Sequence, residues 1–188
     1  MSEEKIITVF GSSRPVEKDA DYTEARELGR ALAKQGLAVC SGGYGGVMEA
    51  VSRGAKESGG KTYGVTAEFF KRNANEWIDV EVRKKTWEER LFGLIDLADG
   101  FAACKGGTGT LVELAVVWEM LNKSLIKAKP FAVLGDFWQP ILDRVREVEQ
   151  DQRPTSESPN WGEARASLVK SAETPQEVAA YLAAQLET

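Results

Sequence analysis

The 188-residue sequence contains no histidine. This absence excludes nucleophilic catalysis of the Ser-His and Cys-His types, and it excludes a histidine-bound zinc ion. Cysteine is almost as scarce, and the two that are present, Cys40 and Cys104, lie inside apolar runs. That placement is typical of buried thiols in a reducing compartment. We therefore expect stability to come from a packed hydrophobic core, which a chain of this length can form.

Long apolar runs and an excess of positive charge are missing as well. No apolar stretch approaches the roughly 20 residues needed to span a bilayer, and the N-terminus lacks the basic region of a secretion signal. We therefore expect a cytoplasmic protein without a membrane partner. A net charge of -5 and a pI near 5.0 argue against a nucleic-acid partner, because such binding depends on lysine and arginine.

Short apolar runs alternate with segments of helical periodicity along the whole chain. Strands are predicted at 6–10, 37–40, 62–65, 77–82, 100–104, 130–134 and 166–169, and a long loop at 149–162. The last helix is predicted to begin after Thr174, where an N-cap residue, a proline in the first turn and a capping box coincide. The pattern predicts a single nucleotide-binding domain over 1–188, of the α/β class: a doubly wound, Rossmann-like parallel sheet with helices on both faces.

Two glycine-rich turns follow predicted strands, at 41–46 and 105–110. In open parallel sheets the ligand crevice lies beyond the carboxyl ends of the strands. Glycine lets a phosphate approach the backbone, and the following helix directs free N–H groups at it. A tight structural connection is the alternative for either turn alone. Neither turn is a P-loop or a strict dinucleotide fingerprint, so a monophosphate is the expected ligand.

Two charged residues are candidates for chemistry. Glu113 comes one helical turn after Thr110, on a face that can look into the crevice; a solvated surface glutamate is the alternative. Arg90 is predicted early in a helix, where a cation opposes the helix dipole, and this unfavourable position points to a ligand. Thr108 and Thr110 add hydroxyl donors to the second turn.

These motifs resemble the Lonely Guy (LOG) family of phosphoribohydrolases. The family hallmark P-G-G-x-G-T-x-x-E is similar to residues 105–113, and its motif G-G-x-x-G-x-M is similar to residues 42–48. Residues 9–13 resemble the family's opening strand and turn, and the resemblance covers residues 5 to about 135. Two positions depart from the family pattern: Lys105 replaces a proline, and Leu91 replaces a lysine.

The resemblance implies cleavage of the N-glycosidic bond of cytokinin riboside 5′-monophosphate, or of an AMP-like nucleotide, to free base and ribose 5-phosphate. It implies Arg90 and Glu113 as catalytic residues and no metal or organic cofactor. The substrate-binding residues that it implies are Ser12, Ser13, Gly43, Gly46, Met48, Gly106, Gly107, Thr108, Gly109 and Thr110. The implied pathway is cytokinin biosynthesis.

Three other functions compete with hydrolysis. A purely structural interaction protein would leave the paired glycine-rich turns unexplained. Lysine decarboxylation, a label often attached to the family, would require pyridoxal phosphate on a catalytic lysine and a larger scaffold, so it is set aside. The serious alternative is a non-catalytic carrier of a nucleotide or of the molybdopterin cofactor, for which the phosphate turns suffice.

A homodimer or larger homo-oligomer is also expected. The helix after Thr110 carries more apolar surface than one face against a sheet requires, at Val116, Val117, Trp118, Met120 and Leu121. The alternative is that Trp118 simply packs inside the monomer.

Overall fold

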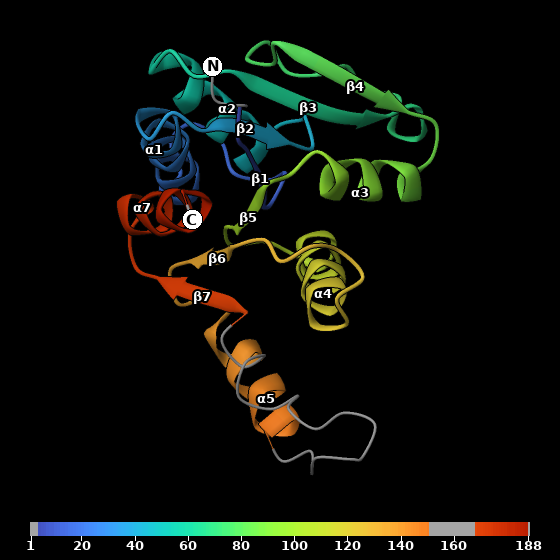
Figure 1. The fold of residues 1–188 in the computed structure, drawn as a ribbon. Coiled ribbons are helices and arrows are strands. Elements are labelled where there is room, and N and C mark those ends of the chain that lie inside the picture. Colours follow the sequence, from blue (N-terminus) through green and yellow to red (C-terminus); the bar gives the residue numbers. More distant parts are fainter. Residues whose placement is uncertain (1–3, 151–167, 188) are drawn as a thin grey trace.

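The protein is built around one seven-stranded parallel sheet with the strand order β4-β3-β2-β1-β5-β6-β7 (Figure 1). The computed structural model describes residues 4–150 and 168–187. The strands are β1 Ile6–Phe10, β2 Ala38–Ser41, β3 Thr62–Ala67, β4 Val80–Lys84, β5 Gly100–Ala103, β6 Phe131–Leu134 and β7 Val169–Ala172. The helices are α1 Ala20–Lys34, α2 Val47–Glu57, η1 Glu68–Phe70, α3 Trp87–Asp96, α4 Thr108–Asn122, α5 Gln139–Gln150 and α7 Pro175–Leu186.

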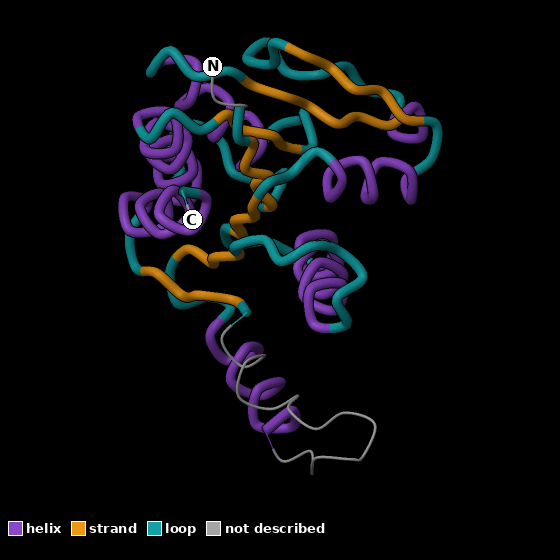
Figure 2. Tube along the Cα trace, in the orientation of Figure 1, coloured by secondary structure: helices purple, strands orange, loops and turns teal. Residues whose placement is uncertain are grey.

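Helices cover both faces of the sheet, and this confirms the predicted doubly wound α/β class (Figure 2). One hydrophobic cluster joins the sheet to α1, α2 and α7, through residues such as Leu28, Val51 and Leu182. The other joins it to α3, α4 and α5, through Leu94, Leu114 and others. Because both faces are covered, the central strands are buried along nearly their whole length, which explains why they stand out as continuous apolar runs.

The strand order reverses at β1, which lies between β2 and β5. Thr8 accordingly pairs with Cys40 on one side and with Phe101 on the other. The turns after these three strands therefore meet at one edge of the sheet. The backbone of Ser12 links all three, because its N–H donates to the carbonyl of Lys105 (3.2 Å) and its carbonyl accepts from the N–H of Val47 (2.8 Å).

The two edge strands and one helix differ from the predictions. The strand predicted at 77–82 starts later, at Val80, because the backbone forms a turn at 76–77 and a bend at Asp79. The carboxylate of Asp79 accepts a hydrogen bond from the N–H of Thr62 (3.0 Å) at this bend. The strand predicted at 166–169 begins at Val169 and continues to Ala172, while residues 166–167 lie outside the described chain. Helix α5 was not predicted. It includes residues 149–150 of the expected long loop, and residues 151–162 of that loop lie outside the described chain.

Two local predictions are confirmed, the capping box and the buried cysteines. Thr174 forms the capping box of α7 with Glu177, with proline in the first turn. Cys40 and Cys104 are free and buried, and burial raises the pKa of each thiol to about 12, so both stay protonated at neutral pH. Within the described ranges, no helix is long and apolar enough to cross a membrane.

Candidate functional site

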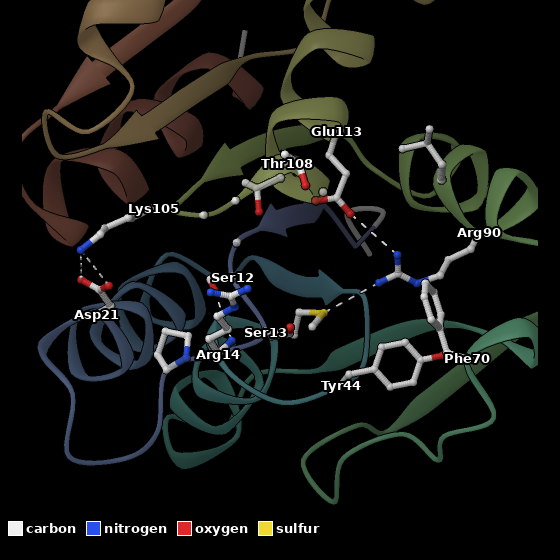
Figure 3. Close-up of a pocket in the computed structure, with 18 of the residues that line it drawn as sticks. Ser12, Ser13, Arg14, Asp21, Tyr44, Phe70, Arg90, Lys105, Thr108 and Glu113 are labelled. Carbon is white, nitrogen blue, oxygen red and sulfur yellow. Dashed lines mark hydrogen bonds and ion pairs between the residues drawn. The ribbon is translucent and has the colours of Figure 1, made fainter.

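A cavity of about 830 Å³ opens at the sheet edge where the turns after β1, β2 and β5 meet (Figure 3). Its walls are the turn at 11–15, the beginning of α1, the segment 105–110 that opens α4, and the first half of α3. Tyr44 and Phe70 contribute aromatic rings. The cavity lies at the reversal point of the strand order, where ligands bind in open α/β sheets.

The N-terminus of α4 forms one wall as bare backbone. The helix begins at Thr108, and its N-cap, Gly107, makes no side-chain capping bond. A Cβ atom at Gly107 or Gly109 would meet nothing within 4 Å, whereas one at Gly106 would lie 2.1 Å from Oγ1 of Thr110. Uncapped N–H groups at the positive end of a helix dipole suit a phosphate group.

Arg90 is buried and held rigidly near this wall. It lies in the first turns of α3, where the hydroxyl of Thr86 accepts a hydrogen bond from the N–H of Glu89 (3.2 Å) and caps the helix. Its Nε donates to the carbonyl of Val65 (2.8 Å), and its Nη2 donates to the carbonyl of Gly42 (3.2 Å). The guanidinium is thus fixed by neutral backbone oxygens, and its positive charge remains available to a ligand or carboxylate.

Glu113 projects into the same space from α4. Its Oε1 lies 3.8 Å from Nη1 of Arg90, and its side chain is 15% exposed. Burial raises the pKa of this carboxyl to about 7, although the positive charge of Arg90 acts in the opposite direction. A carboxyl group with such a pKa can give or take a proton at neutral pH, as a general acid or base must.

The end of the cavity around Arg90 is aromatic. The guanidinium lies 5.5 Å from the ring centre of Tyr44 and 5.7 Å from that of Phe70. The hydroxyl of Tyr44 accepts a hydrogen bond from the N–H of Ala67 (2.9 Å), which fixes the ring. Trp87 and other apolar side chains complete this end, namely Met48 and Leu91. Flat apolar surfaces of this kind suit a nucleobase, which stacks on aromatic rings.

Sequence reasoning missed the aromatic residues of this end. Tyr44 stands inside the first glycine-rich turn, so its position carried a signal that could have been used. Phe70 comes from η1, and only the folded chain brings its ring to 5.6 Å from that of Tyr44, measured between the ring centres (Figure 3). Trp87, at the start of α3, lines the same cavity. Arg14, directly after the predicted pair Ser12 and Ser13, was also missed; it lines the cavity too.

The structure brings nearly all of the predicted site residues to this cavity. Arg90 and Glu113 line it together with Ser12, Ser13, Met48, Gly106, Gly107, Thr108, Gly109 and Thr110. Gly43 and Gly46 are not among the lining residues. Gly46 instead has a φ of 71°, and a Cβ atom there would lie 2.3 Å from the carbonyl oxygen of Ser12, so it lets the first two turns pack together. The catalytic and binding roles of these residues remain predictions.

No metal site accompanies the cavity in the part of the chain that the structure describes, because no three cysteine or acidic side chains converge there. The residues that line the cavity offer hydrogen-bond donors suited to an anionic organic ligand: cationic side chains, hydroxyl groups and backbone N–H groups.

Known proteins resemble the chain in sequence and in structure. Residues 4–158 match the SLOG cluster4 family. Cytokinin riboside 5′-monophosphate phosphoribohydrolases are similar: that of Mycobacterium marinum is 35% identical over 57% of this chain and 62% of its own length. That of Rhodococcoides fascians is 28% identical over 75% of this chain and 74% of its own length. The chain thus spans less than two thirds of the Mycobacterium relative.

A solved structure shares the whole fold. The molybdenum cofactor binding protein of Rippkaea orientalis superposes with a TM-score of 0.75 and 24% identity, and the match covers 100% of both chains. Because its identity is low, this likeness concerns the fold alone. The family match, in contrast, extends through the glycine-rich turns, Arg90 and Glu113. The chain therefore belongs to the SLOG/LOG family.

Proposed function

We propose that this protein is a nucleoside 5′-monophosphate phosphoribohydrolase. It would cleave the N-glycosidic bond of cytokinin riboside monophosphate or of an AMP-like nucleotide, giving the free base and ribose 5-phosphate. One observation carries the proposal: the buried carboxyl of Glu113, with a pKa raised to about 7, lies 3.8 Å from the guanidinium of Arg90 and one helical turn from the N-terminus of α4. The activity named for the curated relatives supports it.

The two ends of the cavity suggest how such a nucleotide would lie. Its 5′-phosphate would accept hydrogen bonds from the first turn of α4, and its base would stack near Tyr44 and Phe70. The ribose would then be next to Glu113, with Ser12, Ser13 and Met48 along its side. Gly43 and Gly46 would contribute through the shape of the turns rather than by contact.

The chemistry would be hydrolysis at C1′ of the ribose. The carboxylate of Glu113 would take a proton from a water molecule, whose oxygen bonds to C1′ while the C1′–N bond breaks and its electron pair leaves with the base. Positive charge develops on the ribose in this step, and a nearby carboxylate stabilises it. Arg90 would donate a hydrogen bond to the departing base. The net reaction adds the hydroxyl of water to the ribose and its proton to the base, and it calls for no cofactor.

The test is to incubate the purified protein with AMP and with isopentenyladenosine 5′-monophosphate and to measure free base by chromatography. Wild-type protein should release base, and Glu113→Gln and Arg90→Ala should reduce the rate by at least about 100-fold, the usual contribution of a general acid-base group. Glu119→Gln is a matched control, because this exposed glutamate lies on the same helix away from the cavity. Unchanged turnover in Glu113→Gln would overturn the proposal.

The carrier function remains the alternative, because the fold is shared with a molybdenum cofactor binding protein. A carrier needs the phosphate wall but no reacting carboxylate. Saturable nucleotide binding without base release, and with equal affinity in wild-type protein and Glu113→Gln, would favour the carrier.

We also propose a cytoplasmic homodimer, in which exposed apolar side chains of α3 and α4 become covered. Phe92 is 47% exposed and Val112 is 37% exposed. Of the five α4 residues expected at an interface, Val117, Trp118 and Leu121 are buried within the monomer, so they stabilise the core instead. Sedimentation velocity tests the proposal: wild-type protein should sediment as a dimer and Phe92→Asp as a monomer, and a monomeric wild type would contradict it.

A further inference from the structure

Glu113 lies on one side of the Arg90 guanidinium, and the rings of Tyr44 and Phe70 lie on the other (Figure 3). The 3.8 Å between Nη1 of Arg90 and Oε1 of Glu113 is longer than a hydrogen bond. A guanidinium and a carboxylate attract each other strongly where water is excluded, and they commonly form two parallel hydrogen bonds. The contacts on the aromatic side must therefore account for the open pair.

The two rings attract the guanidinium away from the carboxylate. Its centre lies 5.5 Å from the ring centre of Tyr44 and 5.7 Å from that of Phe70. A cation within about 6 Å of a ring centre is attracted by the negative charge of the ring face, and the attraction is stronger when both groups are buried. The rings pack edge to face, with their planes at 77°. Phe70 is 37% exposed, so its contact with Arg90 leaves ring surface for a base.

Tyr44 is also connected to both carbonyl groups that accept hydrogen bonds from Arg90. Its hydroxyl accepts from the N–H of Ala67 (2.9 Å) and donates to the carbonyl of the same residue (3.2 Å). Ala67 comes two residues after Val65 on β3, and the carbonyl of Val65 accepts from Nε of Arg90. Gly42, whose carbonyl accepts from Nη2, comes two residues before Tyr44 in the first glycine-rich turn. Tyr44 thus fixes the two backbone segments that anchor the guanidinium.

The turn that carries Tyr44 is itself anchored. The side-chain amide of Asn75 donates to the carbonyl of Tyr44 (2.9 Å), and the backbone N–H of Asn75 donates to the carbonyl of Gly43 (2.8 Å). Tyr44 is therefore held through its hydroxyl and through its backbone, and its buried ring offers a fixed surface to Arg90.

Arg90 is the charge on which the ionisation of Glu113 depends. The other charged groups that line the cavity are Arg14, Arg72, Lys105, Asp19 and Asp21. In the described part of the chain only Arg90 forms an ion pair with Glu113, whereas Lys105 pairs with Asp21. Burial raises the pKa of Glu113 and the charge of Arg90 lowers it, so the distance between the two groups determines the balance.

We propose that Tyr44, together with Phe70, is a positioning residue that holds Arg90 out of contact with Glu113. The catalytic value of this arrangement rests on the proposed function, whereas the arrangement itself does not. An open pair leaves Nη1 of Arg90 free to donate a hydrogen bond to the departing base, and it leaves Glu113 basic enough to take a proton from water. A closed pair would use both groups on each other.

The test is a carbon NMR titration of the Glu113 carboxyl in nucleotide-free protein. Tyr44→Leu removes the ring and keeps apolar bulk, so Arg90 should close on Glu113, and the midpoint should fall from about 7 by about 1 to 3 pH units. Tyr44→Phe keeps the ring, so the midpoint should stay at the wild-type value. Tyr63→Leu changes a half-buried tyrosine of β3 outside the cavity; it is the matched control and should also leave the midpoint unchanged.

The pH profile of base release gives a second measurement. Glu113 acts as a carboxylate, so the rate should rise with pH through the pKa of this group. In Tyr44→Leu this rise should move to lower pH, and the maximal rate should fall at least about tenfold because Arg90 no longer reaches the base. A substitution that only loosened the fold would lower the rate without moving the rise to lower pH.

Phe70→Leu repeats the test at a more exposed position, where a substitution disturbs the core less. Its midpoint should also fall, and this variant decides the question if Tyr44→Leu does not fold. A midpoint that stays unchanged or rises in the folded variants would overturn the positioning role.

The outcomes separate this inference from the proposed function. A lowered midpoint in Tyr44→Leu, in a protein that releases no base, supports the positioning role and refutes the hydrolase. Base release by wild-type protein with an unchanged midpoint in Tyr44→Leu refutes the positioning role and leaves the hydrolase. An unchanged midpoint without base release refutes both.

Discussion

Oε1 of Glu113 lies 3.8 Å from Nη1 of Arg90, and both side chains are largely buried. This separation is longer than a hydrogen bond, so the pair gains less than a close ion pair would. Arg90 also gives hydrogen bonds to the carbonyls of Val65 and Gly42. For the Glu113 carboxylate, the free-energy cost of desolvation therefore exceeds the electrostatic attraction to Arg90, and the pKa of this group rises to about 7.

The raised pKa makes the stability of the protein depend on pH. The folded chain holds the Glu113 proton up to about pH 7, whereas the unfolded chain releases it near 4.5. The stabilising effect of this proton is thus complete below about 4.5 and is lost as pH rises through about 7. Between about pH 4 and pH 8, Glu113→Gln should gain about 3 kcal/mol in free energy of unfolding relative to wild type. Urea denaturation at both pH values measures it.

The control for this experiment is Glu119→Gln, which changes an exposed carboxyl on the same helix. Its difference from wild type should be nearly the same at both pH values. If Glu113→Gln, like the control, shows no pH-dependent gain in the free energy of unfolding, Glu113 is solvated in the folded protein.

The titration of Glu113 can also be followed directly. Carbon NMR of protein labelled at the glutamate carboxyl should show one glutamate with a midpoint near pH 7, absent in Glu113→Gln. Arg90→Met should raise that midpoint, because the cation that favours the carboxylate is gone. A midpoint that stays unchanged in Arg90→Met would show that the two groups do not interact.

Gly42 is the residue through which the first glycine-rich turn accommodates Arg90. A Cβ atom at Gly42 would lie 1.7 Å from Nη2 of Arg90, so Gly42→Ala must displace the guanidinium. We expect base release to fall by at least about tenfold, as for other misplaced catalytic groups, while the far-ultraviolet circular dichroism is unchanged. Gly45→Ala in the same turn is the control, since the nearest atom to its Cβ would be 3.9 Å away. Equal activity in the two variants would contradict the role proposed for Arg90.

Thr86 supports Arg90 through the cap of α3. Its hydroxyl accepts the hydrogen bond from the N–H of Glu89, and Arg90 follows in the same turn. Thr86→Ala should lower the free energy of unfolding by about 1 kcal/mol, and Thr86→Ser should restore most of it. Thermal denaturation of both variants measures the effect. A loss of equal size in Thr86→Ser would show that the methyl group, not the cap, is responsible.

Local patterns predicted much of the fold. The segments at β1, β5 and β6 are short, mostly apolar runs: β1 is followed by Gly11, β5 begins at Gly100, and β6 lies between Pro130 and Gly135. Thr174 carries a complete capping box. The larger errors in strand bounds fall at the two edges of the sheet, where the strands are incompletely buried. Strand β4 is largely exposed or half-buried, so it lacks the continuous apolar run of the central strands.

Helix α5 was missed although its sequence has helical spacing. Leu142 is buried and Val145 packs against the same core cluster, three residues apart. Pro140 is the second residue of the helix and lies in its first turn, where proline is favoured, so the sequence did carry signals for α5 that the strand-based interpretation left unused.

The sequence by itself determined the parts of the site that are local. The order of strand, glycine-rich turn and helix fixed the bare N-terminus of α4, and the helical repeat put Glu113 one turn from it. Only the tertiary structure decided that Arg90 of α3 meets Glu113, that Phe70 and Trp87 join Tyr44, and that Arg14 reaches the same cavity. The physical reason is that burial and charge act through space: the pKa of Glu113 depends on which side chains exclude water from it, and those come from segments far apart in the chain.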